Sequence, residues 1–239
     1  MEEVTFFPQG DHAVAIVFND KINRETHSQI RHFSSYLIRN SFDGLVEVVP
    51  GYTSVTVYYD PIKMKSVSPY EEVVTILKKQ LSKQNERNEF PSNIVTIPVC
   101  YGGKYGPDLS YVAAYHNLSE QKVIEIHTHT EYLVYMIGFA PGFPYLGGMS
   151  QKIATPRKDT PKVNIPAGSI GIGGEQTGIY PLDSPGGWQL IGQTPIKLFD
   201  QHQAQPSLLK AGDIVRFVQI TPEKFEHWER GDIHVDKGN

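Results

Sequence analysis

The stretch that decides the fold is PAGSIGIGGEQTGIYP, residues 166–181, where apolar residues alternate with glycine. Glycine and proline are disfavoured inside regular elements and are common in tight turns between short strands. The same composition continues on either side, because twelve of the 21 glycines lie between Gly138 and Gly192. We therefore expect the second half of the chain to form a compact β-barrel or sandwich.

Apolar runs around this stretch predict the other elements of the same domain. The runs expected to be strands are residues 94–99, 132–137, 197–199 and 213–218, the last two closing the barrel. Residues 108–116 indicate a short helix. Residues 119–127 leave two alternatives open. One is a helix started by Ser119-Glu120, which we favour, and the other is a strand with Glu125, His127 and His129 on one face.

The first 85 residues combine strand and helix patterns. Residues 11–18 are apolar on both faces, which predicts a buried strand in the middle of a sheet. Residues 23–40 carry Ile30, Phe33 and Leu37 at steps of three and four, which predicts an amphipathic helix.

Two further signals complete this N-terminal domain. The runs 45–49 and 54–59 are separated by Pro50-Gly51 and predict a hairpin. The tetrapeptide Ser68-Pro69-Tyr70-Glu71 has the residues of a capping box and predicts the start of a second helix. The order strand, strand, helix, hairpin, helix indicates an open-faced α/β sandwich of ferredoxin-like type.

Composition places the domain boundaries. From Ser82 to Asn93 only Phe90 is strongly apolar, as in a linker. The expected fold class is α+β. We assign residues 1–85 to the ferredoxin-like α/β domain, 86–93 to a linker, 94–222 to the β-barrel domain and 223–239 to a polar C-terminal tail that begins as a short helix.

Charge and cysteine content argue against several classes of partner. The chain has 22 basic and 26 acidic residues, so it offers no electrostatic footprint for nucleic acid or an anionic membrane. Cys100 is the single cysteine, which rules out an intrachain disulfide and fits a reducing compartment. There is no secretory signal pattern at the N-terminus and no long apolar run. We expect a cytoplasmic protein with no nucleic-acid or membrane partner.

Three glycine- and proline-rich loops, residues 138–148, 166–181 and 183–192, carry the candidate site. Rigid aromatic side chains on such loops favour binding, and glycines can present backbone N–H groups to an anion or a polarised carbonyl. The structural alternatives are that the aromatics plug the barrel and that the glycines turn its corners. The residues expected to line a substrate or partner pocket are Pro141, Gly142, Phe143, Pro144, Tyr145, Arg157, Gln176, Tyr180, Ser184, Pro185, Gly186, Gly187 and Trp188.

No catalytic residue can be assigned from these loops. Residues 166–181 lack the Gly-Lys-Ser/Thr ending of a P-loop, so nucleotide binding there is not favoured. Ser184 does not lie in a Gly-x-Ser-x-Gly elbow and has no base beside it in the sequence. Arg157 and Lys158 could clamp a carboxylate, although a solvated surface is an equal alternative.

Histidine and cysteine offer only weaker candidates. Glu125, His127 and His129 resemble a metal set, but a His-x-His pair on a helix points its rings apart, so we expect no metal. A capping or core role is the default for these histidines, and His127 is kept as a weak candidate for the pocket. Cys100 follows an apolar strand and is expected to be a buried small hydrophobe rather than a thiolate.

Taken together, four blocks resemble the signature of the B subunit of the bacterial 5-oxoprolinases, the family also called allophanate hydrolase subunit 1. The blocks are residues 138–148, 155–157, 166–181 and 184–192. The resemblance covers most of residues 94–220 and extends to the N-terminal α/β pattern. It implies a ferredoxin-like domain followed by a cyclophilin-like β-barrel.

The resemblance also implies a function and partners. Members of this family act with two other 5-oxoprolinase subunits, an A subunit of the lactam-utilisation type and a C subunit similar to allophanate hydrolase subunit 2. Together these subunits open 5-oxoproline to L-glutamate at the expense of ATP. The similar paired domains in urea carboxylase receive a small amide, so a pocket for a ring amide is implied here. The chain alone would be inactive and without a cofactor, and ATP, with Mg²⁺, would serve the assembled complex.

A second implication is of a different class. The family includes an inhibitor of a sporulation histidine kinase of bacilli, so this chain is expected to bind such a kinase and block its autophosphorylation. The alternative to an enzyme subunit is therefore a regulator of the kinase with no catalytic role, since a groove at a barrel mouth can receive a helix without any catalytic residue.

Overall fold

The computed structural model describes residues 4–20, 22–83 and 92–229. The chain divides into two compact units, Met1–Pro91 and Ser92–Asn239, and each is described by itself. The linker expected over residues 86–93 lies mostly outside the described residues, and so does the part of the C-terminal tail after residue 229.

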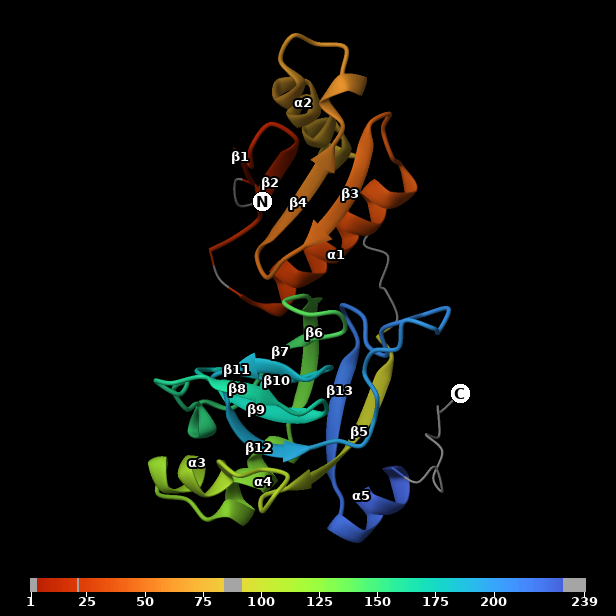
Figure 1. Cartoon of the computed structure of the whole chain (residues 1–239). Helices are drawn as coiled ribbons and strands as arrows, with labels where there is room; N and C mark the ends of the chain where they lie inside the picture. Colours follow the sequence, from red (N-terminus) through yellow and green to blue (C-terminus); the bar gives the residue numbers. More distant parts are fainter. Residues whose placement is uncertain (1–3, 21, 84–91, 230–239) are drawn as a thin grey trace. The chain divides into compact units, whose positions relative to one another are not determined.

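The first unit is a four-stranded antiparallel sheet of order β1-β2-β4-β3 with two helices (Figure 1). Its elements are β1 (Thr5–Pro8), β2 (Ala13–Val17), α1 (Arg24–Arg39), β3 (Leu45–Pro50), β4 (Ser54–Tyr59), the short η1 (Pro61–Lys63) and α2 (Pro69–Ser82). Strand β2 lies inside the sheet and is buried over most of its length, as its apolar sequence predicts.

The predicted helices form, but one of them starts differently from the prediction. In α1, Asn23 caps the helix by accepting a hydrogen bond from the Thr26 N–H at 2.8 Å. In α2 the predicted capping box is wrong, because the Ser68 side chain makes no cap hydrogen bond. Glu72, rather than Glu71, folds back and accepts from the backbone N–H groups of the preceding loop. The loop is therefore fixed by a carboxylate one position later than the pattern indicated.

The order of elements in this unit is ββαββα, as the sequence predicts. A ferredoxin-like domain has the order βαββαβ, with its additional strand at the end rather than at the start. The ferredoxin-like assignment is therefore not confirmed. The general description as a sheet with helices packed on it holds, since Ile30, Phe33, Leu37 and Leu77 of the helices are fully buried.

The second unit is built around a closed seven-stranded barrel of order β10-β7-β6-β13-β5-β12-β9. Its elements are β5 (Ile94–Tyr101), α3 (Leu109–Tyr115), α4 (Glu120–Thr128), β6 (Glu131–Ile137), β7 (Pro144–Gly147), η2 (Gln151–Ile153), β8 (Lys162–Ile165), β9 (Ser169–Gly173), β10 (Gln176–Ile179), β11 (Ser184–Gly186), β12 (Gln189–Gln193), β13 (Ile214–Gln219) and α5 (Pro222–Glu229). This confirms the expected β-barrel, and the barrel fits a cyclophilin-like fold. Strands β5 and β13 pair in parallel, whereas the other barrel pairs are antiparallel.

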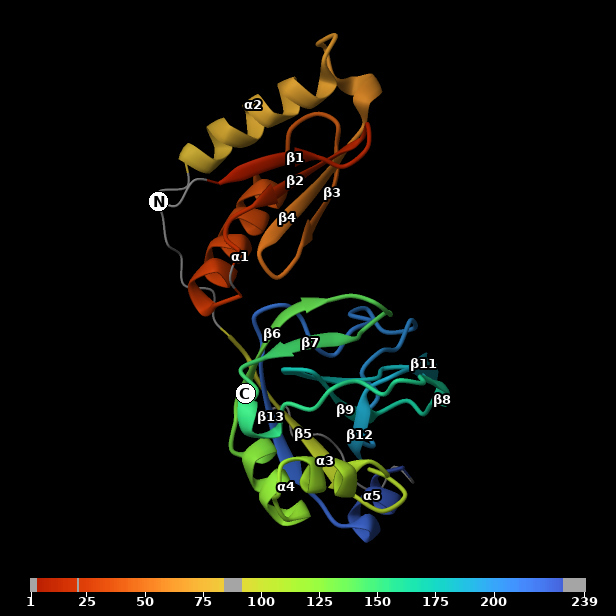
Figure 2. The same ribbon diagram turned by 90° about the vertical axis from the view of Figure 1, so that its left-hand side faces the viewer.

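Two smaller groups of elements flank the barrel. Helices α3 and α4 lie together at one end of it, and β8 pairs with β11 as a small sheet at its side (Figures 1 and 2). The helical alternative for residues 119–127 is thus confirmed, with Ser119 accepting from the Lys122 N–H at 3.1 Å as the N-cap.

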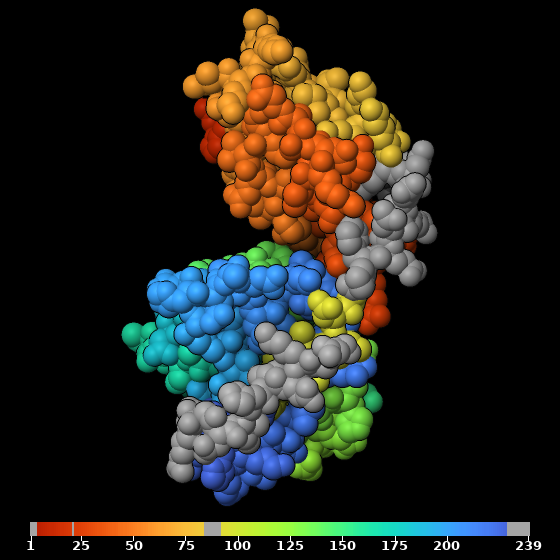
Figure 3. Space-filling model, turned by 90° about the vertical axis from the view of Figure 1, so that its right-hand side faces the viewer, coloured from red at the N-terminus to blue at the C-terminus, as the bar shows by residue number. Residues whose placement is uncertain are grey.

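The segment between β12 and β13 corrects one prediction. Residues 197–199 do not form a barrel strand, and Phe199 makes only an isolated bridge to Ser207. The backbone of this segment is satisfied internally, because the Leu208 N–H donates to the Leu198 carbonyl and the Asp200 N–H to the Pro206 carbonyl, both at 2.8 Å. It lies on the surface of the second unit (Figure 3). Strand β13 closes the barrel without it.

None of the described helices is both long enough and apolar enough to span a bilayer.

Candidate functional site

The aromatic residues predicted for the pocket lie together. The Phe143 ring centroid is 5.6 Å from that of Tyr180 and 5.7 Å from that of Trp188, and both pairs are edge to face. With Ile165 and Leu190 they form a small core beside the main barrel core. All three rings are buried, with exposed fractions of 3% for Phe143 and Tyr180 and 6% for Trp188. The three rings therefore pack edge to face against one another and expose almost no surface to solvent.

The glycines of residues 166–181 form the floor under these rings. A Cβ on Gly173 would lie 2.5 Å from the Trp188 indole nitrogen, and one on Gly178 would lie 3.0 Å from the Phe143 ring. Gly171 is similarly close to Trp188. Strands β9 and β10 thus present a side-chain-free surface on which the aromatic rings lie. These three glycines of the glycine-rich stretch therefore make room for Trp188 and Phe143.

We expect Gly173→Ala to destabilise the second unit by about 1–3 kcal/mol, the usual cost of overpacking. The new methyl group cannot be accommodated without moving the buried indole. Gly187→Ala is the matched control, because a Cβ there meets nothing closer than 3.6 Å. Urea unfolding followed by tryptophan fluorescence reports on this unit alone, since both tryptophans of the chain, Trp188 and Trp228, belong to it. Equal stabilities of the two variants would contradict this account of the glycine floor.

The loop between β6 and β7 presents one aromatic ring to solvent. Phe139 has a φ of +68° and the Ala140 N–H donates to the Gly138 carbonyl at 2.8 Å, which is a tight γ-turn. A left-handed Phe is an uncommon, strained conformation. Pro141-Gly142 then forms a turn closed by the Phe143 N–H to the Ala140 carbonyl, with Gly142 at positive φ. The Phe139 side chain remains 68% exposed.

A strap of basic residues, which we define as residues 155–162, passes beside Trp188. The Arg157 guanidinium lies over the Trp188 ring at 5.7 Å from its centroid. The Lys158 ammonium is 2.7 Å from Asp108 Oδ1, and that of Lys162 is 3.4 Å from Asp108 Oδ2. The Lys158 N–H also donates to the Gly187 carbonyl at 2.7 Å. The strap is therefore held at both its backbone and its side chains.

Asp108 and Lys162 belong to this arrangement, although the sequence did not single them out. Asp108 occupies the N-cap position of α3 but makes no cap hydrogen bond with its side chain. Its Oδ2 instead accepts from the Leu190 N–H at 2.8 Å. A helix-start Asp is such a common feature that only its distant partners, 50 to 82 residues away, reveal the different role.

The remaining predicted residues flank the same region. The Tyr180 hydroxyl lies against Gly186, where a Cβ would come within 2.4 Å of it. Burial raises the pKa of Tyr180, and the charge of Arg157 partly opposes this. Tyr145 packs edge to face on Phe143 at 5.1 Å. The others are Pro141, exposed in the β6–β7 loop; Pro144 in β7; Gln176, paired with Gly173; and Ser184 and Pro185 in β11.

Two buried side-chain atoms in this region lack a hydrogen-bond partner among the described residues. They are Ser184 Oγ and Gln189 Oε1. Gln189 is only 3% exposed, and its Nε2 donates to the Pro156 carbonyl at 3.0 Å. Gln189 follows Trp188 in the sequence but was not predicted as a site residue, since nothing in the sequence shows that its amide lies beneath the strap.

His127, the weak candidate, is a buried part of the barrel end. Its Nδ1 is 2.8 Å from the Tyr101 hydroxyl and its Nε2 is 3.1 Å from Thr177 Oγ1. Because Thr177 Oγ1 donates to the Gly171 carbonyl, it accepts from Nε2–H, and Nδ1 accepts from Tyr101. The imidazole also stacks on Phe217 at 4.6 Å. Burial lowers the pKa of His127 to about 3, so this side chain is a neutral structural group.

This histidine predicts a pH dependence of stability. In the unfolded chain an imidazole takes up a proton below about pH 6.5. Folded His127 stays neutral down to about pH 3. The unfolded state therefore binds more protons in this window, and stability falls as the pH is lowered. Between pH 7 and pH 5 we expect a loss of about 2 kcal/mol from this group.

His127→Gln should remove this part of the slope of unfolding free energy against pH, whereas His129→Gln, on the exposed side of the same helix, should retain it. Urea unfolding at several pH values measures both slopes. An unchanged slope in His127→Gln would show that another group carries the dependence.

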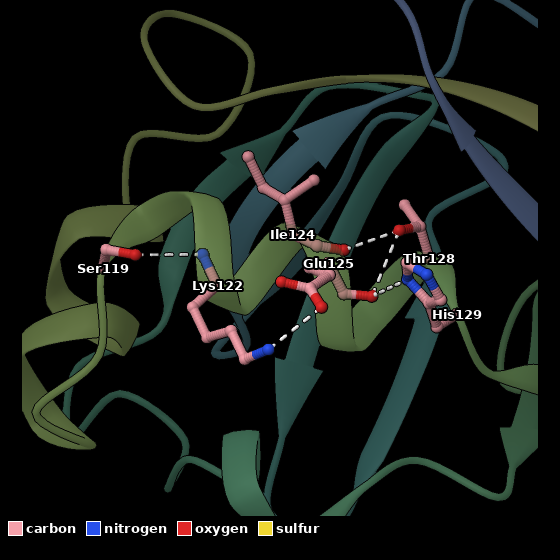
Figure 4. Close-up of polar contacts among 6 residues, drawn as sticks. All are labelled: Ser119, Lys122, Ile124, Glu125, Thr128 and His129. Atoms are coloured by element: carbon pink, nitrogen blue, oxygen red, sulfur yellow. Dashed lines mark hydrogen bonds and ion pairs between the residues drawn. The ribbon is translucent and has the colours of Figure 1, made fainter.

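The Glu125, His127 and His129 set does not converge on one point. Figure 4 shows Glu125 paired with Lys122 at 2.9 Å, and the His129 ring against the Glu125 carbonyl at 2.8 Å. His127, by contrast, is fully buried. Throughout the described part of the chain, no group of three or more His, Cys, Asp or Glu side chains is placed to hold a metal ion.

Cys100 is buried at the end of β5, beside Tyr105 and Phe225. Burial raises the pKa of its thiol. The side chain is therefore a small apolar group, as the sequence predicts.

The fold and this region define a carboxyltransferase-type module, since residues 4–209 match the family described as carboxyltransferase domain, subdomain C and D. Within that class the chain belongs to the family of 5-oxoprolinase B subunits. It is 47% identical over 226 residues to the B subunit of 5-oxoprolinase from Bacillus subtilis (strain 168), covering 92% of this chain and 94% of that protein.

Solved structures show the same fold within longer chains. The crystal structure of TTHA0988 has a TM-score of 0.74 and 33% identity, covering 87% of this chain and 40% of that chain. The urea amidolyase of K. lactis has a TM-score of 0.77 at 20% identity, covering 98% of this chain and 16% of that one. This chain thus spans less than half the length of these two proteins.

Proposed function

We propose that this chain is a non-autonomous subunit of an ATP-dependent 5-oxoprolinase, a hydrolase that opens the lactam of 5-oxoproline to L-glutamate. The observation that carries the proposal is the 47% identity to a 5-oxoprolinase B subunit over 94% of that protein's length. The identity extends across both units of the chain, so it is not confined to a common barrel.

The architecture of the relatives favours action in a complex. In TTHA0988 the part that resembles this chain is 40% of a longer polypeptide, and in the urea amidolyase it is 16%. A module that is covalently joined to others in some proteins is expected to bind separate chains when it stands alone. We propose the A and C subunits of 5-oxoprolinase as those chains, in the cytoplasm, with ATP and Mg²⁺ bound by the assembled complex.

The chemistry of the site agrees with a binding role. Ring opening requires an activated carbonyl and an attacking water, and a serine nucleophile requires an adjacent base. Among the described residues, Ser184 Oγ has no hydrogen-bond partner, so no base activates it. Arg157, whose guanidinium lies over the Trp188 ring, can hold and orient a small anion. The phosphorylation or hydrolysis step then belongs to the partner subunits.

Reconstitution tests this proposal. The chain is combined with the A and C subunits of the Bacillus subtilis enzyme, and ATP-dependent release of L-glutamate from 5-oxoproline is measured with each protein omitted in turn. We expect turnover only when all three are present. Full turnover by this chain alone, or none by the three together, would reject the proposal.

The second candidate function is inhibition of a sporulation histidine kinase, which the sequence resemblance to the inhibitor KipI implies. The observation that favours a protein-binding role is Phe139, an aromatic ring held 68% exposed by a strained turn. Exposed aromatic residues on rigid loops are frequent anchors in protein interfaces.

An autophosphorylation assay tests the second candidate. The purified kinase is incubated with the chain, and Phe139→Ser is expected to weaken inhibition about tenfold, as truncation of an interface anchor does. The control is Phe7→Ser, at a site 50% exposed in the first unit. No inhibition by the unmodified chain would leave the enzyme role as the remaining function.

A further inference from the structure

The basic strap carries more positive charge than its neighbours neutralise. The strap carries Arg157, Lys158 and Lys162, and the nearby carboxylates by sequence or contact are Asp159 and Asp108, which leaves a net charge of +1. Asp108 is shared by the two lysines, whereas Arg157 has its guanidinium over the Trp188 ring and is otherwise exposed. Arg157 is thus the cation of this group that is placed to bind an anion.

Arg157 is also preorganised. The backbone on either side of it is fixed, because the Pro156 carbonyl accepts from Gln189 Nε2 and the Lys158 N–H donates to Gly187. A guanidinium stacked on an indole keeps its N–H edge free for a planar, bidentate partner. A carboxylate has that geometry.

Gln189 supplies a second group at the same place. Its nitrogen is hydrogen-bonded to the carbonyl of Pro156, the residue before Arg157, so the Gln189 amide lies next to the strap. In the described part of the chain its buried oxygen, Oε1, has no partner. Buried acceptors nearly always have a donor. The missing donor is therefore expected to come from a bound molecule.

We propose that the strap and Gln189 bind a small molecule in which a carboxylate and an amide N–H are attached to the same carbon. Arg157 binds the carboxylate, and Gln189 Oε1 accepts the hydrogen bond from the N–H. The identity of the ligand as 5-oxoproline rests on the proposed function, because in that compound the lactam nitrogen and the carboxylate share one carbon. On the protein, Arg157 lies over the Trp188 ring, and Gln189 follows Trp188 in the sequence.

Gln189 is tested through selectivity. Binding of 5-oxoproline and of its lactone analogue, 5-oxotetrahydrofuran-2-carboxylate, is measured by calorimetry on the full chain and on the reconstituted complex. We expect the lactam to bind about tenfold more tightly, the value of one hydrogen bond to a buried acceptor. Gln189→Met should abolish this preference. Gln193→Met is the matched control, since Gln193 of the same strand also donates to a backbone carbonyl, that of Ala167.

Arg157 is tested through the carboxylate. Arg157→Gln should weaken 5-oxoproline binding about 10- to 100-fold, as expected for loss of a charge-assisted hydrogen bond, and should not change binding of 2-pyrrolidinone, which has no carboxylate. Lys152→Gln removes the same charge from an exposed position five residues away and should have little effect. Fluorescence unfolding confirms that each variant remains folded.

The outcomes separate this proposal from the proposed function. If Gln189→Met keeps the preference for the lactam, Oε1 is satisfied by water or by the protein, and the proposal is wrong. Absence of 5-oxoproline binding by both the chain and the complex is equally decisive against it. If the complex turns over 5-oxoproline and Arg157→Gln leaves KM unchanged, the function stands and this site does not. If the variants show the expected binding pattern but no complex turns over 5-oxoproline, the binding site is supported and the proposed function is rejected.

Discussion

Trp188→Ala is expected to lower the free energy of unfolding of the second unit by about 3–5 kcal/mol, the range for removal of a buried large aromatic side chain. The indole is 6% exposed and contacts Phe143 and Tyr180 edge to face. The floor beneath it consists of glycines, which have no side chains that could move into the space. The cavity should therefore persist, which places the loss near the upper end of the range.

Trp228 fluorescence follows the unfolding of this variant, because it is the remaining tryptophan of the unit. Trp188→Phe keeps part of the ring contact and is expected to lose less than half as much. Trp188→Ala also removes the ring over which the Arg157 guanidinium lies. Binding of 5-oxoproline should therefore fall in this variant even under conditions in which the unit is folded. A loss below about 1 kcal/mol would show that the glycine floor collapses or that the ring is not packed as described.

Gly106→Ala is expected to cost more than about 3 kcal/mol, because the clash is with backbone, which cannot rotate away as a side chain does. A Cβ at this position would lie 2.0 Å from the Ile191 carbonyl oxygen and 2.2 Å from its carbon. The Gly106 turn leads directly to Asp108, whose N–H donates to the Leu190 carbonyl at 2.8 Å. The substitution should therefore also displace the anchor of Lys158 and Lys162.

The control for Gly106 lies three residues earlier. Gly103 has a φ of +53°, and a Cβ added there would have no atom within 4 Å, so Gly103→Asn, a residue that tolerates this conformation, should change stability little. Circular dichroism during urea unfolding compares the two variants. If Gly106→Ala is as stable as Gly103→Asn, the close approach of this turn to β12 is not required for folding.

Local patterns were sufficient wherever neighbours in sequence decide the structure. The apolar steps of α1, the Pro50-Gly51 hairpin and the Ser119 cap all depend on contacts within a few residues, and all of them form. The capping box of α2 does not form, because the Ser68 N–H donates to Ser66 Oγ and the Ser68 side chain makes no cap hydrogen bond. The strand expected at residues 197–199 does not form, because a lysine followed by two apolar residues does not reveal whether the backbone pairs with the barrel or with its own loop.

The candidate site also has features that local sequence patterns predicted and features that they did not. The convergence of Phe143, Tyr180 and Trp188 followed from three glycine- and proline-rich loops in one barrel domain. Their burial did not, because the distance between a ring and the glycine floor is set by strands that pair across the barrel. Asp108 and Gln189 were missed since each contacts its partner across 33 to 82 residues.

By itself the sequence determined the two-part organisation, the barrel and most of the regular elements, because composition, periodicity and turn residues are local properties, and its four glycine- and proline-rich blocks carried the resemblance to the family. Only the tertiary structure decided that the glycines seat an indole, that one carboxylate holds two lysines, and that His127 is buried and neutral. Those properties depend on distances between segments far apart in the chain. A side chain becomes buried, and its pKa shifts, only after these segments have packed together.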